Sequence, residues 1–206
     1  MQKYLFLILL AFLAVGIFFP IIGLFALVCM LAPVALAIWK GRFWCGNFCP
    51  RGSFYDHIGK FLSSHRPMPQ LFFNIHLRIA VILVLMSGFS WQVYKAWPYP
   101  EAIGAAFIKM ILITTIIGLI LGAIYHERSW CAFCPMGTLS ALTTPSNNQR
   151  LYVADSCINC TLCSKACPFH LKPYLAKGNI NGYLENDCIK CGRCIKACPK
   201  QALILK

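Results

Sequence analysis

The last part of the chain contains the same cysteine spacing twice, C-x2-C-x2-C-x3-C-P. The first copy consists of Cys157, Cys160, Cys163 and Cys167, and the second of Cys188, Cys191, Cys194 and Cys198, each followed by proline. Cysteines at this spacing wrap their thiolates round one corner of an iron–sulfur cube. Disulfide scaffolds do not repeat such an eight-cysteine pattern, and zinc takes its ligands as two separated pairs. The spacing therefore predicts two 4Fe–4S clusters.

The fourth cysteine of each copy is expected to cross to the other cluster, because a helical turn carries it away from its neighbours. We assign one cluster to Cys157, Cys160, Cys163 and Cys198, and the other to Cys188, Cys191, Cys194 and Cys167. This crossing makes each half depend on the other. Residues 151–206 are thus expected to form an α+β two-cluster bacterial ferredoxin domain of paired β-α-β halves.

Residues 1–150 have the composition of a membrane domain. Of all 206 residues, 59% are apolar and only 12% are charged, and the apolar excess lies before residue 150. Four apolar runs stand out, at 4–19, 21–39, 77–93 and 102–125, and a bilayer-spanning helix needs about 20 residues. The first and third are short. The expected fold is an α-helical membrane bundle of four transmembrane helices, fused to the ferredoxin domain.

The start of the chain also has features of a signal peptide, since Lys3 precedes an apolar run. No small-x-small cleavage site precedes Pro20, however, and the apolar pattern resumes directly after it. We therefore expect the first run to be retained as a helix that turns at Pro20 into the second.

Basic residues are distributed unevenly between the two ends of these runs. One end carries Lys3, Lys40, Arg42, Arg51, Lys60, Arg66, Arg78, Arg128 and Arg150, whereas the loop 92–101 carries only Lys95. Under the positive-inside rule this places both termini on the cytoplasmic side of the inner membrane. Thiols stay reduced there, so the 13 cysteines are better explained by metal ligation than by disulfides.

Two loops at the basic end repeat one another. They begin at Arg42 and Arg128 and both read R-x-W-C-(one or two residues)-F-C-P-x-G-[ST]. Proline biases the preceding cysteine toward extended geometry, and glycine permits a sharp turn into the next helix. Two related hairpins packed face to face would bring four cysteines together. These are Cys45, Cys49, Cys131 and Cys134.

Three uses of the four loop cysteines remain open: a third iron–sulfur cluster, two redox-active dithiol pairs, or a soft-metal site for zinc or copper. The cluster is the leading interpretation, because a ferredoxin tethered at this face needs an electron relay into the membrane. The second loop is one residue shorter than the first, C-x2-C-P against C-x3-C-P. That difference leaves the equivalence of the two loops open.

A few other residues are candidates. Glu101 and Lys109 form an ionisable pair near lipid, which is either functional or simply a helix-start carboxylate with a snorkelling lysine. His57, His76 and His126 lie near the inner interface, either as hydrogen-bond donors to a quinone headgroup or as ordinary interfacial histidines. A lone cysteine in the second run, Cys29, is expected to be a small buried hydrophobe without a cluster role.

The ferredoxin segment is basic, with eight lysine or arginine residues against three acidic ones. This charge suits docking on anionic lipid or on an acidic redox partner. A net charge of +13 also raises the question of nucleic acid. Membrane orientation accounts for much of that charge and no binding motif accompanies it, so we expect no nucleic-acid partner.

Taken together, the four apolar runs, the two Cys-Pro loops and the terminal eight-cysteine segment resemble the NapH/NosR/CcoG group of membrane-bound polyferredoxins. The resemblance covers essentially the whole chain, and NapH-like members are nearest, since no flavin-binding segment of the NosR-like kind is present in it. The resemblance implies a quinol dehydrogenase component that passes electrons between the membrane quinone pool and a redox partner protein. It maps the family's loop cysteines onto Cys45, Cys49, Cys131 and Cys134.

Two other functions stay open at this point. One is a metal reductase or assembly factor of the CcoG type, in which the loop cysteines bind copper and the ferredoxin supplies the electron. The other is a non-catalytic membrane anchor subunit of a redox complex, in which the clusters are structural.

Overall fold

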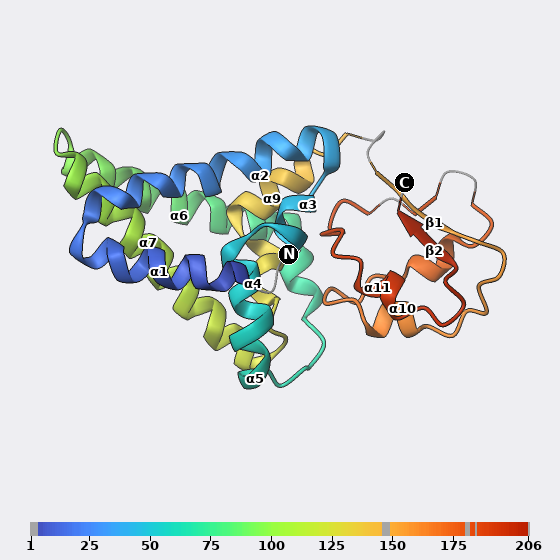
Figure 1. The fold of residues 1–206 in the computed structure, drawn as a ribbon. Coiled ribbons are helices and arrows are strands. Elements are labelled where there is room, and N and C mark those ends of the chain that lie inside the picture. Colours follow the sequence, from blue (N-terminus) through green and yellow to red (C-terminus); the bar gives the residue numbers. More distant parts are fainter. Residues whose placement is uncertain (1–3, 146–148, 180–181, 184, 206) are drawn as a thin grey trace.

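The computed structural model describes residues 4–145, 149–179, 182–183 and 185–205. Lys3 and Lys206, two of the basic residues counted above, lie outside this range. A bundle of long helices occupies one part of the molecule and the cysteine-rich domain lies at one end of it (Figure 1). The bundle consists of α1 (Leu5–Phe18), the 3₁₀ helix η2 (Pro20–Phe25), α2 (Ala26–Lys40), α6 (Ile75–Ala96) and α7 (Pro100–Ile124).

Within the described residues, three helices are long and apolar enough to cross a membrane: Pro20–Lys40, Ile75–Ala96 and Pro100–Ile124. The helix α1 is equally apolar but has only 14 residues. At about 1.5 Å per residue it is shorter than the roughly 30 Å hydrocarbon core of a bilayer. The structure thus supports three of the four expected spans by length and composition.

The chain reverses direction at Pro20, as expected, and the turn packs tightly on α7. Glycine makes this approach possible, because a Cβ atom on Gly23 would overlap the carbonyl of Gly104, and one on Gly104 would overlap the carbonyl of Pro20. The two backbones therefore touch directly. This turn and the α6–α7 loop lie at the end of the bundle remote from the cysteine-rich domain (Figure 1).

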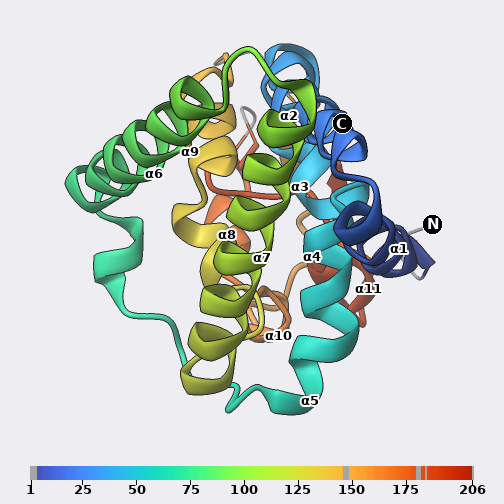
Figure 2. The same cartoon turned by 90° about the vertical axis from the view of Figure 1, so that its left-hand side faces the viewer.

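Short helices form the other end of the bundle. They are α3 (Phe43–Asn47), α4 (Pro50–Phe54), the π-helical turn η3 (Tyr55–Gly59), α5 (Lys60–Leu62), η4 (Gln70–Phe73), α8 (Ser129–Phe133) and α9 (Pro135–Leu142). Tyr55, Trp130 and Phe133 are buried among them, and the Tyr55 ring fills the space left by the missing side chain of Gly118 on α7. Figure 2 shows α7 between α6 on one side and α1 and α4 on the other.

The cysteine-rich domain contains little regular structure. Its elements are β1 (Leu151–Val153), α10 (Leu162–Lys165), the 3₁₀ helix η5 (Pro173–Ala176), α11 (Arg193–Lys196) and β2 (Leu203–Leu205). The two strands pair antiparallel, with Tyr152 opposite Ile204, and Leu151 also bridges Tyr183. Each half carries one short helix, as expected. Among the described residues the only paired strands are β1 and β2, so the strand content is smaller than two complete β-α-β halves.

Candidate metal centres

The eight cysteines of the terminal domain line two separate pockets. One pocket is lined by Cys157, Cys160, Cys163 and Cys198, and the other by Cys167, Cys188, Cys191 and Cys194. These are the two sets that the sequence assigns to two clusters, including the exchange of the fourth cysteine. Four cysteines round one pocket fit the ligand requirement of a 4Fe–4S cluster.

The backbone of the two halves is bent in the same unusual way at matching positions. Left-handed φ angles occur at Asn159 and Lys190 (53° and 52°), Thr161 and Gly192 (59° and 72°), and His170 and Gln201 (51° and 48°). Such angles are costly for most residues, and they turn successive N–H groups toward a bound anion, as in many iron–sulfur sites. Because the same backbone strain occurs at equivalent positions of both halves, it indicates that the two halves share a binding function.

Backbone N–H groups do point at the sulfurs. Burial raises the pKa of the Cys188 thiol to about 11, and the N–H of Lys190 acts against this rise. Burial likewise raises the pKa of Cys167, opposed by the N–H groups of Phe169 and Leu171. Ala202 N donates to Cys198 Sγ at 3.4 Å. These donors favour a negatively charged sulfur, which is the form that ligates iron.

The two Cys-Pro loops of the bundle are held together by a reciprocal pair of arginines. Arg42 Nη2 of the first loop donates to the carbonyl of Cys131 in the second at 2.6 Å. Arg128 Nη1 of the second loop donates to the carbonyl of Cys45 in the first at 2.8 Å. Both arginine side chains are fully buried. The loops therefore face one another across a local approximate two-fold axis.

Glycine in each loop makes room for the arginine of the other. A Cβ atom on Gly52 would lie 2.7 Å from Arg128 Nη1, and one on Gly137 would lie 2.6 Å from Arg42 Nη2. The glycines of the repeated motif are thus explained by the same exchange. The sequence predicted that these glycines permit a turn. The structure shows that they also leave space for the arginine side chain of the opposite loop.

The second cysteine of each loop has the extended backbone that the following proline predicts. Cys49 caps α4 with ψ of 115°, and Cys134 caps α9 with ψ of 131°. The first cysteine of each loop lies inside a five-residue helix, α3 or α8. In the longer loop Phe48 lies between the end of α3 and Cys49, whereas α8 ends directly before Cys134. The loops are therefore equivalent in arrangement despite their different lengths.

All four loop cysteines line one cavity of about 370 Å³, together with Arg42. Burial raises the pKa of Cys45, opposed by Arg42, and raises the pKa of Cys131 to about 11, opposed by Arg128. Four thiolates round a 4Fe–4S core carry a net charge of about −2. The buried guanidinium group of Arg42, which lines the cavity, and that of Arg128, whose Nη1 lies 4.0 Å from Cys131 Sγ, would offset that charge.

The loop cavity is much larger than the two pockets of the terminal domain, at about 370 Å³ against about 20 and 40 Å³. It continues between the apolar helices, where Phe12, Phe25, Met30, Phe107 and Met110 line it. A cluster at the cysteines would leave apolar space beside it.

The terminal domain docks directly on the first Cys-Pro loop. A Cβ atom on Gly46 would overlap the carbonyl of Ile189 and lie 3.1 Å from the backbone nitrogen of Cys191. Asn47 Nδ2 donates to the carbonyl of Lys190 at 3.1 Å. The pocket that contains Cys191 therefore faces the bundle, and the pocket that contains Cys157 lies on the far half of the domain.

Replacing Gly46 with alanine is expected to loosen this contact, because the added methyl group meets backbone that cannot rotate away. Such overpacking typically costs about 1–3 kcal/mol. Hydrogen–deuterium exchange of the backbone at residues 189–191 should become about tenfold faster, while iron content stays unchanged. Gly88→Ala is the matched control, since nothing lies within 4 Å of its added Cβ. Equal rates in the two variants would contradict the docking contact.

Asp187 of the terminal domain binds two arginines of the bundle. Arg78 makes a bidentate contact with it, Nη1 to Oδ1 at 2.8 Å and Nη2 to Oδ2 at 3.0 Å. Arg42 Nη1 donates to the same carboxylate at 3.0 Å. The arginine that reaches the second Cys-Pro loop is thus also tied to the terminal domain.

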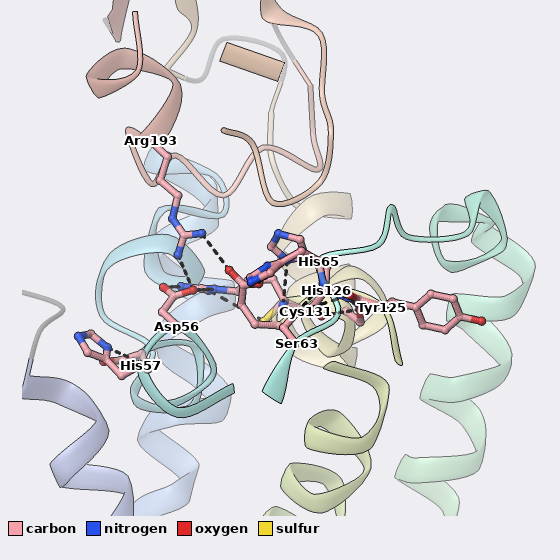
Figure 3. Close-up of polar contacts among 12 residues, drawn as sticks. Asp56, His57, Ser63, His65, Tyr125, His126, Cys131 and Arg193 are labelled. Carbon is pink, nitrogen blue, oxygen red and sulfur yellow. Dashed lines mark hydrogen bonds and ion pairs between the residues drawn. The ribbon is translucent and has the colours of Figure 1, made fainter. Parts of the chain in front are cut away.

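A second ionic contact joins Arg193, which lies between Cys191 and Cys194, to two carboxylates of the bundle (Figure 3). Arg193 forms ion pairs with Asp56 and with Glu127, and Arg128 also binds Asp56. Burial disfavours ionisation of Asp56, but Arg128 and Arg193 outweigh it and hold the pKa of Asp56 below its usual value. This carboxylate therefore stays charged at neutral pH.

Sequence reasoning assigned no role to these acidic residues. The chain has only six acidic residues, and Asp56, Glu127 and Asp187 lie where the bundle meets the terminal domain. The signal in the sequence that could have indicated their role is that so few acidic residues accompany 19 basic ones. An acidic residue close to the basic end of the bundle can form ion pairs with the arginines there.

The remaining sequence candidates do not join the cysteine sites. His57 stacks on Phe6 and its Nδ1 contacts the Ser53 carbonyl at 3.0 Å, while His76 is exposed. Neither lines the loop cavity. Glu101 and Lys109 are exposed and form no ion pair with each other. The expectation that Cys29 is buried is wrong: it is exposed on α2 and lines the loop cavity, because the cavity opens between α1 and α2.

Two protein-family models match this chain. A 4Fe-4S binding domain matches residues 22–69 and 108–148, which contain both Cys-Pro loops, and a 4Fe-4S dicluster domain matches residues 156–203. The chain is therefore an iron–sulfur protein with 4Fe–4S ferredoxin-type domains. No solved structure matches it.

Three curated proteins are similar to this chain in sequence. Two uncharacterized proteins of Methanocaldococcus jannaschii are 26% and 25% identical over 153 residues, which is 68% of this chain and 56% and 63% of theirs. The Escherichia coli K12 protein named "Putative electron transport protein YccM" is 24% identical over 172 residues, 72% of this chain and 47% of its own length. The chain thus spans about half to three fifths of these relatives.

Proposed function

We propose that this protein carries electrons between the membrane quinone pool and a redox partner through three iron–sulfur centres. Two are the 4Fe–4S clusters of the terminal domain, with the crossed ligand sets given above. The third is held by Cys45, Cys49, Cys131 and Cys134 where the bundle meets that domain. Each centre supplies one-electron uptake and release, and the chain's residues set where these centres lie and how strongly they hold an electron.

The observation that carries this proposal is the reciprocal arginine exchange between the Cys-Pro loops. It holds four cysteines round one cavity and supplies positive charge beside them. Two independent dithiol pairs would not require the loops to face each other. The match of a 4Fe-4S binding domain to both loop segments supports the same assignment.

The docking of the terminal domain supports an order for the three centres. Gly46 follows Cys45 directly and touches the backbone of Cys191. The cluster of Cys188, Cys191, Cys194 and Cys167 would therefore be the one next to the loop site, with the other cluster outermost. Electrons would pass between partner and membrane through these centres in series.

A quinone would occupy the apolar part of the loop cavity, beside the third centre. The cavity reaches between the membrane helices and carries aromatic and methionine side chains, which suit a hydrophobic ring and tail. Oxidation of a quinol here would release two protons and two electrons, the electrons leaving one at a time. This assignment corresponds to the quinol dehydrogenase role that the NapH-like resemblance implies.

We further propose four spans in the inner membrane, with both termini cytoplasmic, because of the excess of basic residues at the cysteine-bearing end. The α1 helix would complete the fourth span with local thinning of the bilayer. The exposed lysines of the terminal domain would face the partner, which should then be acidic. These are Lys165, Lys172, Lys177, Lys196 and Lys200.

Metal and sulfide analysis tests the number of centres. Protein purified without oxygen should contain about 12 iron atoms and as many acid-labile sulfides per chain, and a Cys45→Ser/Cys134→Ser variant about 8. The same measurement separates the other uses of the loops. Eight iron atoms in the wild type, with copper or zinc at the loops, would favour a metal reductase, and eight iron atoms alone would favour dithiols.

A further inference from the structure

Two histidines and a glutamate lie together where the bundle meets the terminal domain, apart from every cysteine site. His126 Nδ1 is 3.1 Å from Glu127 Oε2, and His65 Nδ1 is 3.6 Å from the same oxygen. The three ligand atoms all lie within 4.8 Å of one another. Figure 3 shows His65 and His126 converging from two separate segments. We propose that these three residues bind a divalent transition-metal ion such as Zn²⁺.

The contacts inside the group leave a carboxylate oxygen available to a cation. His126 Nδ1 has one lone pair, which accepts the backbone N–H of Arg128 at 3.4 Å, so an ion bound at Nδ1 would replace this long contact. Glu127 Oε2 is buried and accepts no hydrogen bond from the described residues. Two lone pairs 3.1 Å apart repel each other unless a cation, either a proton or a metal ion, lies between them. Imidazole nitrogen and carboxylate oxygen are ligands that zinc accepts.

The spacing suits a small metal ion. In a tetrahedral site with bonds of about 2.0–2.2 Å, neighbouring donor atoms lie about 3.3 Å apart. The observed separations from Glu127 Oε2, 3.1 and 3.6 Å, lie on either side of this value. Three protein ligands leave one position for water, as in open zinc sites.

The peptide backbone holds the ligands in place without a metal. Arg66 N donates to the carbonyl of Tyr125 at 2.9 Å, and Ser64 N donates to that of Ala123 at 3.3 Å. These bonds tie the segment on both sides of His65 to the end of α7. His65 itself has a left-handed φ of 51°, and its N–H donates to Ser63 Oγ at 3.2 Å. The site is thus preorganised on two segments.

Charged groups round the site balance one another. Glu127 Oε1 faces Arg193 at 3.4 Å, and Asp56 binds both Arg193 and Arg128. The ring of His170 lies 6.3 Å from that of His126. Two carboxylates thus face two guanidinium groups, and the ion would be held by coordination rather than by excess negative charge. An ion here would also compete with Arg193, a residue of the second cysteine run, for Glu127.

X-ray absorption at the zinc edge tests the ligand set directly. Full-length, cluster-loaded protein in lipid nanodiscs would receive one equivalent of Zn²⁺, with the cluster absorbance followed to show that the clusters persist. We expect a shell of nitrogen and oxygen at about 2.0–2.1 Å. A sulfur shell at about 2.3 Å would place the ion on cysteine and overturn the proposal.

Affinity measurements on variants identify the residues. His65 has an exposed side chain, so His65→Ala should leave the fold and the clusters intact. Loss of an outer-shell partner alone costs about 10–100-fold in metal affinity, so loss of a ligand should weaken Zn²⁺ binding by at least about 100-fold. Glu127→Gln should do the same. His76→Ala, an exposed histidine elsewhere, is the control, and equal affinity of His65→Ala and His76→Ala would overturn the site.

Discussion

Replacing Cys131 with serine is expected to abolish electron exchange between the terminal domain and a quinone. The third centre needs four sulfur ligands from two loops, so the loss of any one should remove it. The two clusters of the terminal domain do not use Cys131 and should keep their spectra. Stopped-flow absorbance of the clusters in nanodiscs, after addition of a soluble quinone analogue, measures the exchange rate.

The other loop cysteines should behave in the same way, and this equality is the sharper part of the test. Cys45→Ser, Cys49→Ser and Cys134→Ser should each reduce the rate to background. Cys29→Ser is the matched control, because Cys29 lines the same cavity outside the two loops. Normal quinone turnover in a variant that lacks all four loop thiols would rule out the relay. Partial activity after the loss of one pair would favour independent dithiols.

Replacing Cys198 with alanine is expected to destroy the cluster built on the first cysteine run. Cys198 belongs to the second run but lines the pocket of Cys157, Cys160 and Cys163. About four iron atoms should be lost. In EPR spectra of the reduced protein, the missing signal should be the one that Cys160→Ala removes.

The reverse exchange supplies the control. Cys167→Ala should remove the signal that Cys191→Ala removes, since Cys167 lines the other pocket. Each pair of variants that removes the same EPR signal would then contain one cysteine from each run. If Cys198→Ala instead removed the signal that Cys191→Ala removes, the crossed ligand sets would be wrong.

The sequence predicts the parts of this protein that depend on local spacing. Cysteine spacing indicated the two groups of four that the pockets gather, and proline after Cys49 and Cys134 indicated their extended backbone. Apolar run length indicated the helices, although α1 is shorter than a full span. Each of these features follows from a pattern that can be read along the chain, either a spacing of neighbouring residues or a repeat of such a spacing.

The features that escaped sequence reasoning depend on residues far apart in the chain. Arg42 and Arg128 were noticed as part of a repeat and as positive charge, but not as hydrogen-bond donors to the opposite loop. Asp187 meets Arg78 across more than a hundred residues. His65 stood out from no motif, because its relation to His126 exists only once the α5–η4 segment is bonded to the end of α7.

The exchange of arginines between the Cys-Pro loops also constrains the order in which the protein can be assembled. The first loop is synthesised long before Arg128, so it cannot take its final form while the later helices are still being made. The terminal domain then closes over Arg42 through Asp187 and over Gly46 through Ile189. A cofactor for the proposed third centre would therefore be bound only after the second hairpin has been inserted, because Cys131 and Cys134 belong to that hairpin. The order of residues along the chain would thus set the earliest point at which such a centre can form.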